Sequence, residues 1–374
     1  MINFASNLNK MINAGLGGPL DPPRTEVAVG HRVIYTEVSG AVASFETNVI
    51  APVKNLRVTM EPVQAGSGDP SPENIRPITG RDSVTVTRTG INVWDEEWVN
   101  GFINDSGVFT ARNDIVGTKN TIPVRPNTTY RFVRSVQGFV TYWKKGHAYN
   151  ALVASDFISR VSLAASVTTF TTPEDCYAVH FNLAAAYGSS YGHDVSVNYP
   201  STDTEYHASE GIATATIQLG TTVYGGTVDV TGGSAESEWS LVDLGTLNWT
   251  YYSTKLVFYA SSPIPRKKYG FTNIICTAYK SRTALTGNNW NLQDKEIGGG
   301  NTSYYIYIKD LSYTDSETFK ASLRGVMACY EMDMPTEITT IPAQLSTLAG
   351  ENNVWSDAGD ISLEYPYYEE TEGY

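Results

Sequence analysis

Residues Asp82 to Tyr206 carry the clearest β-strand pattern in the sequence. They open with the alternating pair Val84 and Val86, and they return with Val195-Ser196-Val197-Asn198-Tyr199 before a turn-forming segment that ends at Tyr206. Alternation with a period of two, punctuated by Gly, Asn, Asp and Pro, is typical of half-buried strands. About eight short strands in about 120 residues favour a jelly-roll sandwich, the architecture of many lectin-like domains.

The flanking sequence is also β-rich, so the whole chain is predicted to be mainly β with a few short helices. At 374 residues it is long enough for two to four domains. The predicted division is residues 1–35 as an N-terminal helix and linker for attachment or oligomerisation, 36–81 as a small β element and loop, 82–206 as the jelly-roll sandwich, and 207–374 as a β-rich region with two short helices.

Three short helices are expected from spacing and capping residues. Phe4, Leu8, Met11 and Ile12 lie at helical spacing before a glycine-rich stop. Near the C-terminus, Thr314 with Glu317 forms a capping-box pattern, followed by Phe319 and Leu323 on one face and Gly325 as the stop. A second C-terminal helix is expected between Thr340 and Gly350, with Pro342 in its first turn.

The composition disfavours two classes of partner. With 26 Lys plus Arg against 39 Asp plus Glu, the formal net charge is −13, which disfavours nucleic acid and anionic membrane surfaces because both bind clustered cations. Cys176, Cys276 and Cys329 show no paired spacing, so we expect buried free thiols. No signal peptide or apolar membrane span is visible, and folding in the cytoplasm is expected.

No motif points to catalysis, to a metal or to another cofactor. The sequence contains no Gly-x-Ser-x-Gly elbow, His-Glu-x-x-His or phosphate-binding loop. Asp95, Glu96 and Glu97 are adjacent carboxylates, which are most simply a solvated face. The expectation is therefore a binding or assembly protein without catalytic residues, metal or cofactor.

Aromatic side chains in the central segment are candidates for sugar binding, because sugar rings stack on flat aromatic faces. The candidates are Trp143, Tyr142, Tyr149, Tyr187, Tyr191 and His193. Tryptophans in sandwiches are more often core residues, and Trp94 and Trp98 are assigned to the core on that ground. For Trp143, which precedes a Lys-Lys-Gly-His turn, exposure and burial both stay open.

Several ordered motifs resemble the minor structural proteins of tailed bacteriophages and prophages of Gram-positive hosts. The resemblance covers about residues 40–365, and its motifs are Pro62 to Ile78, Val124 to Tyr130, Tyr199 to Tyr206, Tyr224 to Val230, Val242 to Trp249, and Gly350 to Asp360. It implies a non-enzymatic virion component of the tail tip, baseplate or fibre with a carbohydrate-binding-like jelly roll. No site residues are carried over from it.

The resemblance also sets the expected partners. They are other virion proteins, further copies of the chain with a trimer favoured, and host cell-surface polysaccharide, with no nucleic acid and no membrane. The expected location is the virion. Two alternatives remain: a purely architectural head fibre, collar or decoration protein, and, with less support, a wall-polysaccharide depolymerase.

Overall fold

The computed structural model describes residues 31–47, 53–134, 136–166, 168–184, 194–268, 273–282, 291–300, 302–342 and 350–370. These residues form a mainly β structure whose strands pair antiparallel except for β24 with β25. The predicted mainly β class is confirmed. No helix among these residues is long and apolar enough to cross a bilayer.

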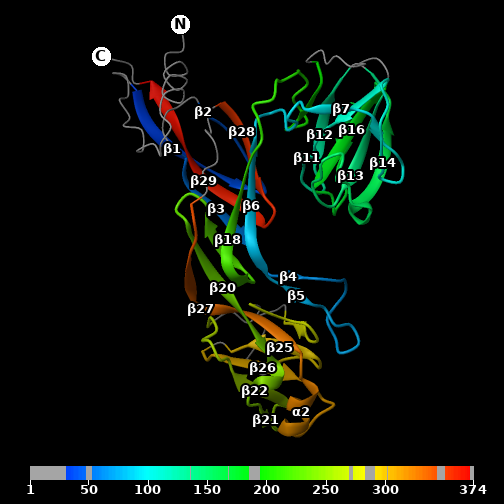
Figure 1. Ribbon diagram of the computed structural model, residues 1–374. Coiled ribbons are helices and arrows are strands. Elements are labelled where there is room, and N and C mark those ends of the chain that lie inside the picture. Colours follow the sequence, from blue (N-terminus) through cyan, green and yellow to red (C-terminus); the bar gives the residue numbers. More distant parts are fainter. Residues whose placement is uncertain are drawn as a thin grey trace.

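Two sheets form the part of the molecule that we call the frame (Figure 1). The seven-stranded sheet has the order β1 (His31–Gly40), β29 (Gly359–Glu370), β3 (Lys54–Met60), β19 (Gly226–Asp229), β20 (Ser234–Asp243), β27 (Met327–Thr339) and β23 (Ile274–Cys276). The four-stranded sheet has the order β18 (Ala213–Val223), β6 (Arg81–Thr89), β28 (Gly350–Ser356) and β2 (Val42–Thr47).

The two frame sheets bury alternate side chains against each other. Val84 and Val86 of β6 and Leu56 and Val58 of β3 are fully buried in one core. The ring of Phe45 on β2 lies 5.2 Å from that of Tyr365 on β29, between centroids. Val84 and Val86 therefore belong to the frame and not to the sandwich that the sequence pattern had assigned them to.

A β-sandwich is inserted between β6 and β18, which pair with each other directly, Arg88 opposite Ala213. We use "the sandwich" for residues 90–211. Its large sheet contains β14 (Phe157–Leu163), β13 (Gly138–Trp143), β16 (Ala178–Ala184), β10 (Ile115–Thr118) and β7 (Trp98–Asn100), with β11 (Ile122–Pro123) also on β16; its small sheet contains β15 (Thr169–Thr171), β12 (Thr129–Val133) and β17 (Ser196–Asn198).

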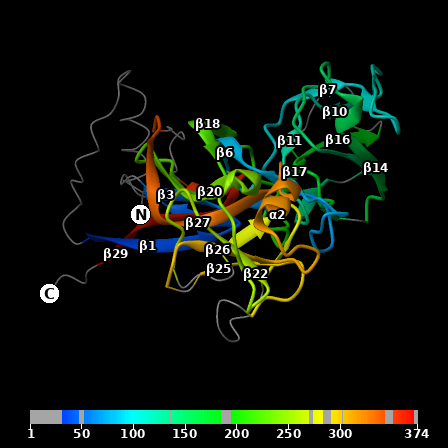
Figure 2. The same cartoon turned by 90° about the horizontal axis from the view of Figure 1, so that it is seen from below.

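The two sandwich sheets meet through aromatic side chains. Phe132 of the small sheet lies 4.7 Å from Phe181 of the large sheet, between ring centroids. A hairpin of β8 (Phe102–Ile103) and β9 (Phe109–Thr110) and a 3-10 turn, η1 (Ala154–Asp156), lie outside these sheets. Seen from below, the sandwich stands to one side of the frame (Figure 2).

A second module, residues 244–326 apart from the frame strand β23, is inserted in the same way between β20 and β27, where Asp243 pairs with Met327. It contains η2 (Leu244–Thr246), a sheet of β21 (Thr250–Tyr252), β22 (Val257–Ser261), β26 (Tyr305–Lys309), β25 (Glu296–Gly299) and β24 (Lys280–Ser281), and the helix α2 (Ser316–Ser322). Phe258 stacks on Phe319 at 3.9 Å in a separate core. A small hairpin, β4 (Val63–Gln64) with β5 (Ile78–Thr79), precedes β6.

The expected helices have different outcomes. The helix near Thr314 is present as α2, but its N-cap is Asp315, whose carboxylate accepts a hydrogen bond from the Thr318 amide at 2.9 Å. The other two helices, over residues 2–14 and between Thr340 and Gly350, fall mainly on residues outside those that the structure describes. All three cysteines are free and buried, as predicted.

Candidate functional site

Trp143 is fully buried and cannot serve as a surface platform for a sugar. It lies on the outer face of the large sheet, where the hairpin β8–β9 covers it with Ile103 and Phe109. Its indole Nε1 donates to Thr141 Oγ1 at 3.0 Å. The ring is therefore satisfied within the chain, and no face of it is left for a ligand.

The other candidates do not assemble into one surface. Tyr142 points into the sandwich core, where its ring lies 6.4 Å from that of Phe170 and burial raises its pKa to about 12. Tyr149 is half-buried against Phe109, with ring centroids 4.8 Å apart. Tyr187, Tyr191 and His193 lie outside the described residues. Trp94 is fully buried in the core, as assigned from the sequence.

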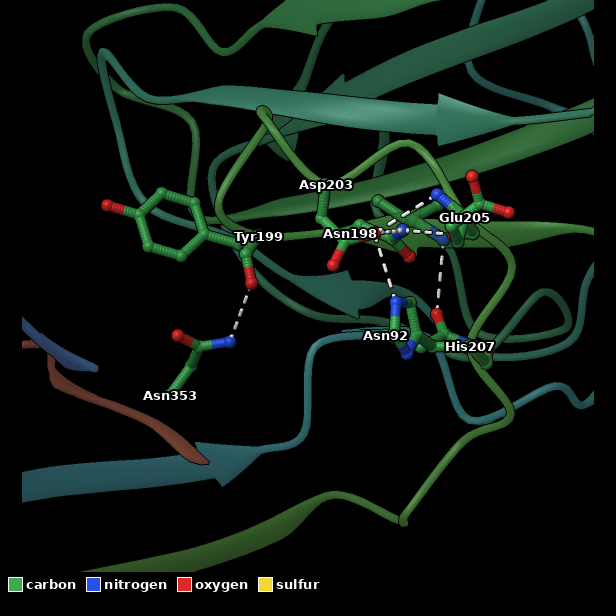
Figure 3. A network of polar contacts seen from close by, with 8 residues as sticks. Asn92, Asn198, Tyr199, Asp203, Glu205, His207 and Asn353 are labelled. Atoms are coloured by element: carbon green, nitrogen blue, oxygen red, sulfur yellow. Dashed lines mark hydrogen bonds and ion pairs between the residues drawn. The ribbon is translucent and has the colours of Figure 1, made fainter. Parts of the chain in front are cut away.

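A polar network joins the sandwich to the frame (Figure 3). Asn353 of β28 donates to the backbone carbonyls of Gly90 and Tyr199, at 3.0 and 2.9 Å. These carbonyls belong to the two chain segments that enter and leave the sandwich. A buried amide that binds both segments fixes where the sandwich attaches, because each lost hydrogen bond would leave a buried carbonyl unsatisfied.

The last segment of the sandwich, after β17, is held by its own polar side chains. Asn198 donates to the carbonyl of Glu205 at 2.7 Å, and Asp203 lies 3.0 Å from His207 Nε2. Asn92 extends the network by donating to the carbonyl of His207 at 3.0 Å. The network is structural in character, since its donors and acceptors are directed at neighbouring backbone or at one another.

A cleft of about 390 Å³ lies beside this junction, between the frame and the sandwich. The frame contributes Arg81, Thr85 and Thr87 of β6 and the turn Trp355 to Gly359 between β28 and β29. The sandwich contributes Pro123 to Pro126 and Tyr177. Clefts between modules are common ligand sites, and this one combines aromatic rings, hydroxyls and charged groups.

The turn that forms one wall of the cleft is tightly fixed. Asp357 accepts a hydrogen bond from the Thr85 amide at 2.9 Å, and its own amide donates to the Thr85 carbonyl at 3.1 Å. Within the turn, Ser356 Oγ accepts from the Gly359 amide at 3.1 Å. The wall is therefore formed before any ligand binds.

The cations of the cleft are weakly paired. Arg81 Nη1 lies 3.8 Å from Asp357 Oδ2, the outer limit of an ion pair. Arg125 Nη1 is buried without a hydrogen bond, and among the described residues no carboxylate lies within ion-pairing distance of it. Burial lowers the pKa of the Arg125 guanidinium, while the charge of Asp360 acts against that shift. The guanidinium nevertheless stays charged at physiological pH.

The motifs singled out in the sequence lie at the joints of the molecule. Arg125 and the Trp355 turn meet in the cleft, and Tyr199 to Tyr206 lies in the polar network. The loop between β4 and β5 contacts the second module, where the Arg76 amide donates to the Thr277 carbonyl at 2.8 Å. Beside it, Gln64 Nε2 of β4 donates to the Cys276 carbonyl of β23 at 2.8 Å. The cleft was not predicted, because its lining comes from segments that are distant in the chain.

Neither a metal site nor a relative defines the site further. Within the described ranges, no group of three or more His, Cys, Asp or Glu side chains could hold a metal ion. No protein-family model, curated protein or solved structure matches the chain. The candidate site is thus defined by the geometry of the junction cleft alone.

Proposed function

We propose that this chain is a non-enzymatic structural component of a tailed-bacteriophage virion, in the tail tip, baseplate or fibre, and that it presents a jelly-roll sandwich to host-surface glycans. The observation that carries the proposal is the way the modules are attached. The sandwich and the second module are each inserted into a hairpin of the frame. The first and last described strands pair with each other, His31 opposite Glu370.

This arrangement supports a role in attachment and display. Both ends of the described chain leave the frame at one place, and the second module lies at the opposite end of the molecule in Figure 1. A protein anchored at one end can present inserted modules without interrupting its own sheets, since β6 pairs with β18 and β20 with β27 on either side of each insertion. Domains are commonly inserted at such hairpin ends.

Assembly of several copies, with a trimer favoured, is part of the proposal. In the described part of the chain, β1 is an edge strand of the seven-stranded sheet. Edge strands offer unpaired backbone groups to another chain. Light scattering of the purified protein at micromolar concentration should give the mass of an oligomer, and a monomeric mass would contradict this part.

A purely architectural role, as a head fibre, collar or decoration protein, is the second candidate. It is favoured by the burial of Trp143 and Tyr142, because aromatic rings expected to bind sugar are occupied by the core. The burial is within one chain, so it does not by itself require neighbouring subunits.

The experiment that tests the proposal is the analysis of virions released by the bacterium that encodes the chain. Mass spectrometry should detect the protein in purified particles, and gold-labelled antibody should gather at the tip of the tail. Label on the head or collar would favour the architectural role. Absence of the protein from intact particles would overturn both.

A further inference from the structure

We propose that the cleft between the frame and the sandwich binds a saccharide that carries a carboxylate. Its volume of about 390 Å³ falls within the range of roughly 300–1,000 Å³ that is usual for ligand clefts. The inference gives the proposed function a ligand class, and it depends on that function only for the source of the saccharide.

The aromatic side chains of the cleft can contact a sugar ring. Tyr177 is 48% exposed, which leaves much of its ring free. Its backbone is fixed by hydrogen bonds on both sides, from its amide to the Trp143 carbonyl at 3.0 Å and from the Val124 amide to its carbonyl at 3.1 Å. Trp355, mostly buried, forms part of the opposite wall. Rigid aromatic rings bind the apolar face of a sugar with little loss of entropy.

The guanidinium of Arg125 is the group that selects a carboxylate. It lines the cleft, and its buried Nη1 has no acceptor among the described residues. A planar guanidinium matches a carboxylate through two parallel hydrogen bonds. A ligand carboxylate in the cleft would give the guanidinium the counter-charge that no carboxylate of the described residues supplies at ion-pairing distance.

The remaining polar groups suit sugar hydroxyls better than a simple anion. Thr85 and Thr87 of β6 line the cleft, with their hydroxyls 3.1 and 3.4 Å from those of Thr216 and Thr214 on β18. Among the described residues, the contact given for Asp357 Oδ2 is the long one to Arg81. The charge of Asp360, which acts on the Arg125 guanidinium, opposes a multiply charged ion such as phosphate there. A singly charged sugar, which both donates and accepts hydrogen bonds, fits this mixture.

The test is calorimetric titration of the full chain with glucuronic and galacturonic acid, as free sugars and in disaccharides, beside the neutral hexose counterparts and inorganic phosphate. We expect a Kd of about 1 mM or tighter for at least one acidic sugar. The neutral counterpart should bind at least tenfold more weakly, a difference of about 1.4 kcal/mol.

Two substitutions in the cleft and one outside it localise the binding. Arg125→Met, which keeps an unbranched apolar stem but removes the guanidinium, and Tyr177→Ala, which removes an exposed ring, should each weaken binding at least tenfold. The control is Arg57→Met, because Arg57 has a similar ion pair, 3.8 Å from Asp229, on another part of the frame. Circular dichroism and thermal melting establish that each variant is folded.

Three results would overturn the inference: no binding of any acidic sugar by the folded protein up to about 10 mM, equal binding of acidic and neutral sugars, or unchanged affinity in both cleft variants. Tight binding of phosphate alone would show an anion site instead. The analysis of virions tests the proposed function without using these titrations. A wrong ligand class can therefore be distinguished from a wrong proposed function.

Discussion

Replacing Trp143 with alanine is expected to lower the free energy of unfolding by about 3–5 kcal/mol, the usual cost of removing a large buried aromatic ring. Trp143 is fully buried and packs edge-on against Phe157 and His180, at 5.2 and 6.0 Å between ring centroids. Urea denaturation measures the change. Tyr177→Ala, at a residue that is 48% exposed, is the control and should stay within about 0.5 kcal/mol of the parent protein.

His180 should make the protein less stable as the pH falls. Burial lowers its pKa from 6.5 to about 4 in the folded state. Below about pH 6.5 His180 binds a proton in the unfolded chain but not in the folded chain. The contribution of His180 to the free energy of unfolding is therefore fully present above that pH and declines until about pH 4. The decline from this group is on the order of 2–3 kcal/mol.

Replacing His180 with a side chain that does not titrate tests whether His180 causes this pH dependence. His180 Nδ1 lies 2.7 Å from Thr118 Oγ1, and glutamine retains the capacity for a hydrogen bond. Unfolding free energies of the parent and of His180→Gln, measured between about pH 7 and pH 4, should converge as the pH falls. Parallel curves would show that His180 does not titrate in this window.

Two adjacent residues, Thr314 and Asp315, are candidates for the N-cap of helix α2, and the structure assigns the cap to Asp315. Asp315→Ala should destabilise the second module by about 1 kcal/mol, because the carboxylate accepts from the Thr318 amide at 2.9 Å. Thr314→Ala should have little effect, although the capping-box pattern pointed to that residue. Thermal melting of both variants decides between them, and a larger effect at Thr314 would contradict the structure.

Strand positions were largely predictable from the sequence, whereas strand partners were not. Alternation correctly marked Val84 and Val86 as the buried face of one strand. It gave no sign that their strand pairs with Ala213 to Gln218, which follow the whole sandwich in the sequence. A period of two identifies the buried face of a strand but not its neighbouring strand. The burial of Trp143 was unpredictable for a similar reason, since its cover comes from the hairpin β8–β9.

The junction cleft belongs to the assembled molecule, and no local pattern encodes it. Its walls come from β6, from the segment around Arg125 and from the turn after Trp355. The sequence signalled the last two segments as motifs but not their proximity. Pairing of β28 with β6, Trp355 opposite Thr87, brings the turn beside β6, and such long-range pairing is what sequence periodicity does not contain.

The molecule should unfold in two calorimetric transitions, because it has two large separate cores. The frame and the sandwich share one core, and the second module has its own around Phe258 and Phe319. The long strands β20 and β27 pass through both, and their register shifts between Ser237 and Trp239. An irregularity of this kind disrupts the hydrogen-bonded ladder, so it weakens the coupling between the two cores.

Single substitutions in each core test this independence. Phe319→Ala should lower only the transition of the second module, and Phe132→Ala only that of the frame and sandwich, each by on the order of 10 °C. Both phenylalanines are fully buried, so the two losses are comparable. The double variant should show both shifts unchanged, since distant sites in separate cores contribute additively. If either substitution lowered one common transition, the joints around Gln64, Asn353 and the β20–β27 ladder would couple the modules more strongly than their separate cores imply.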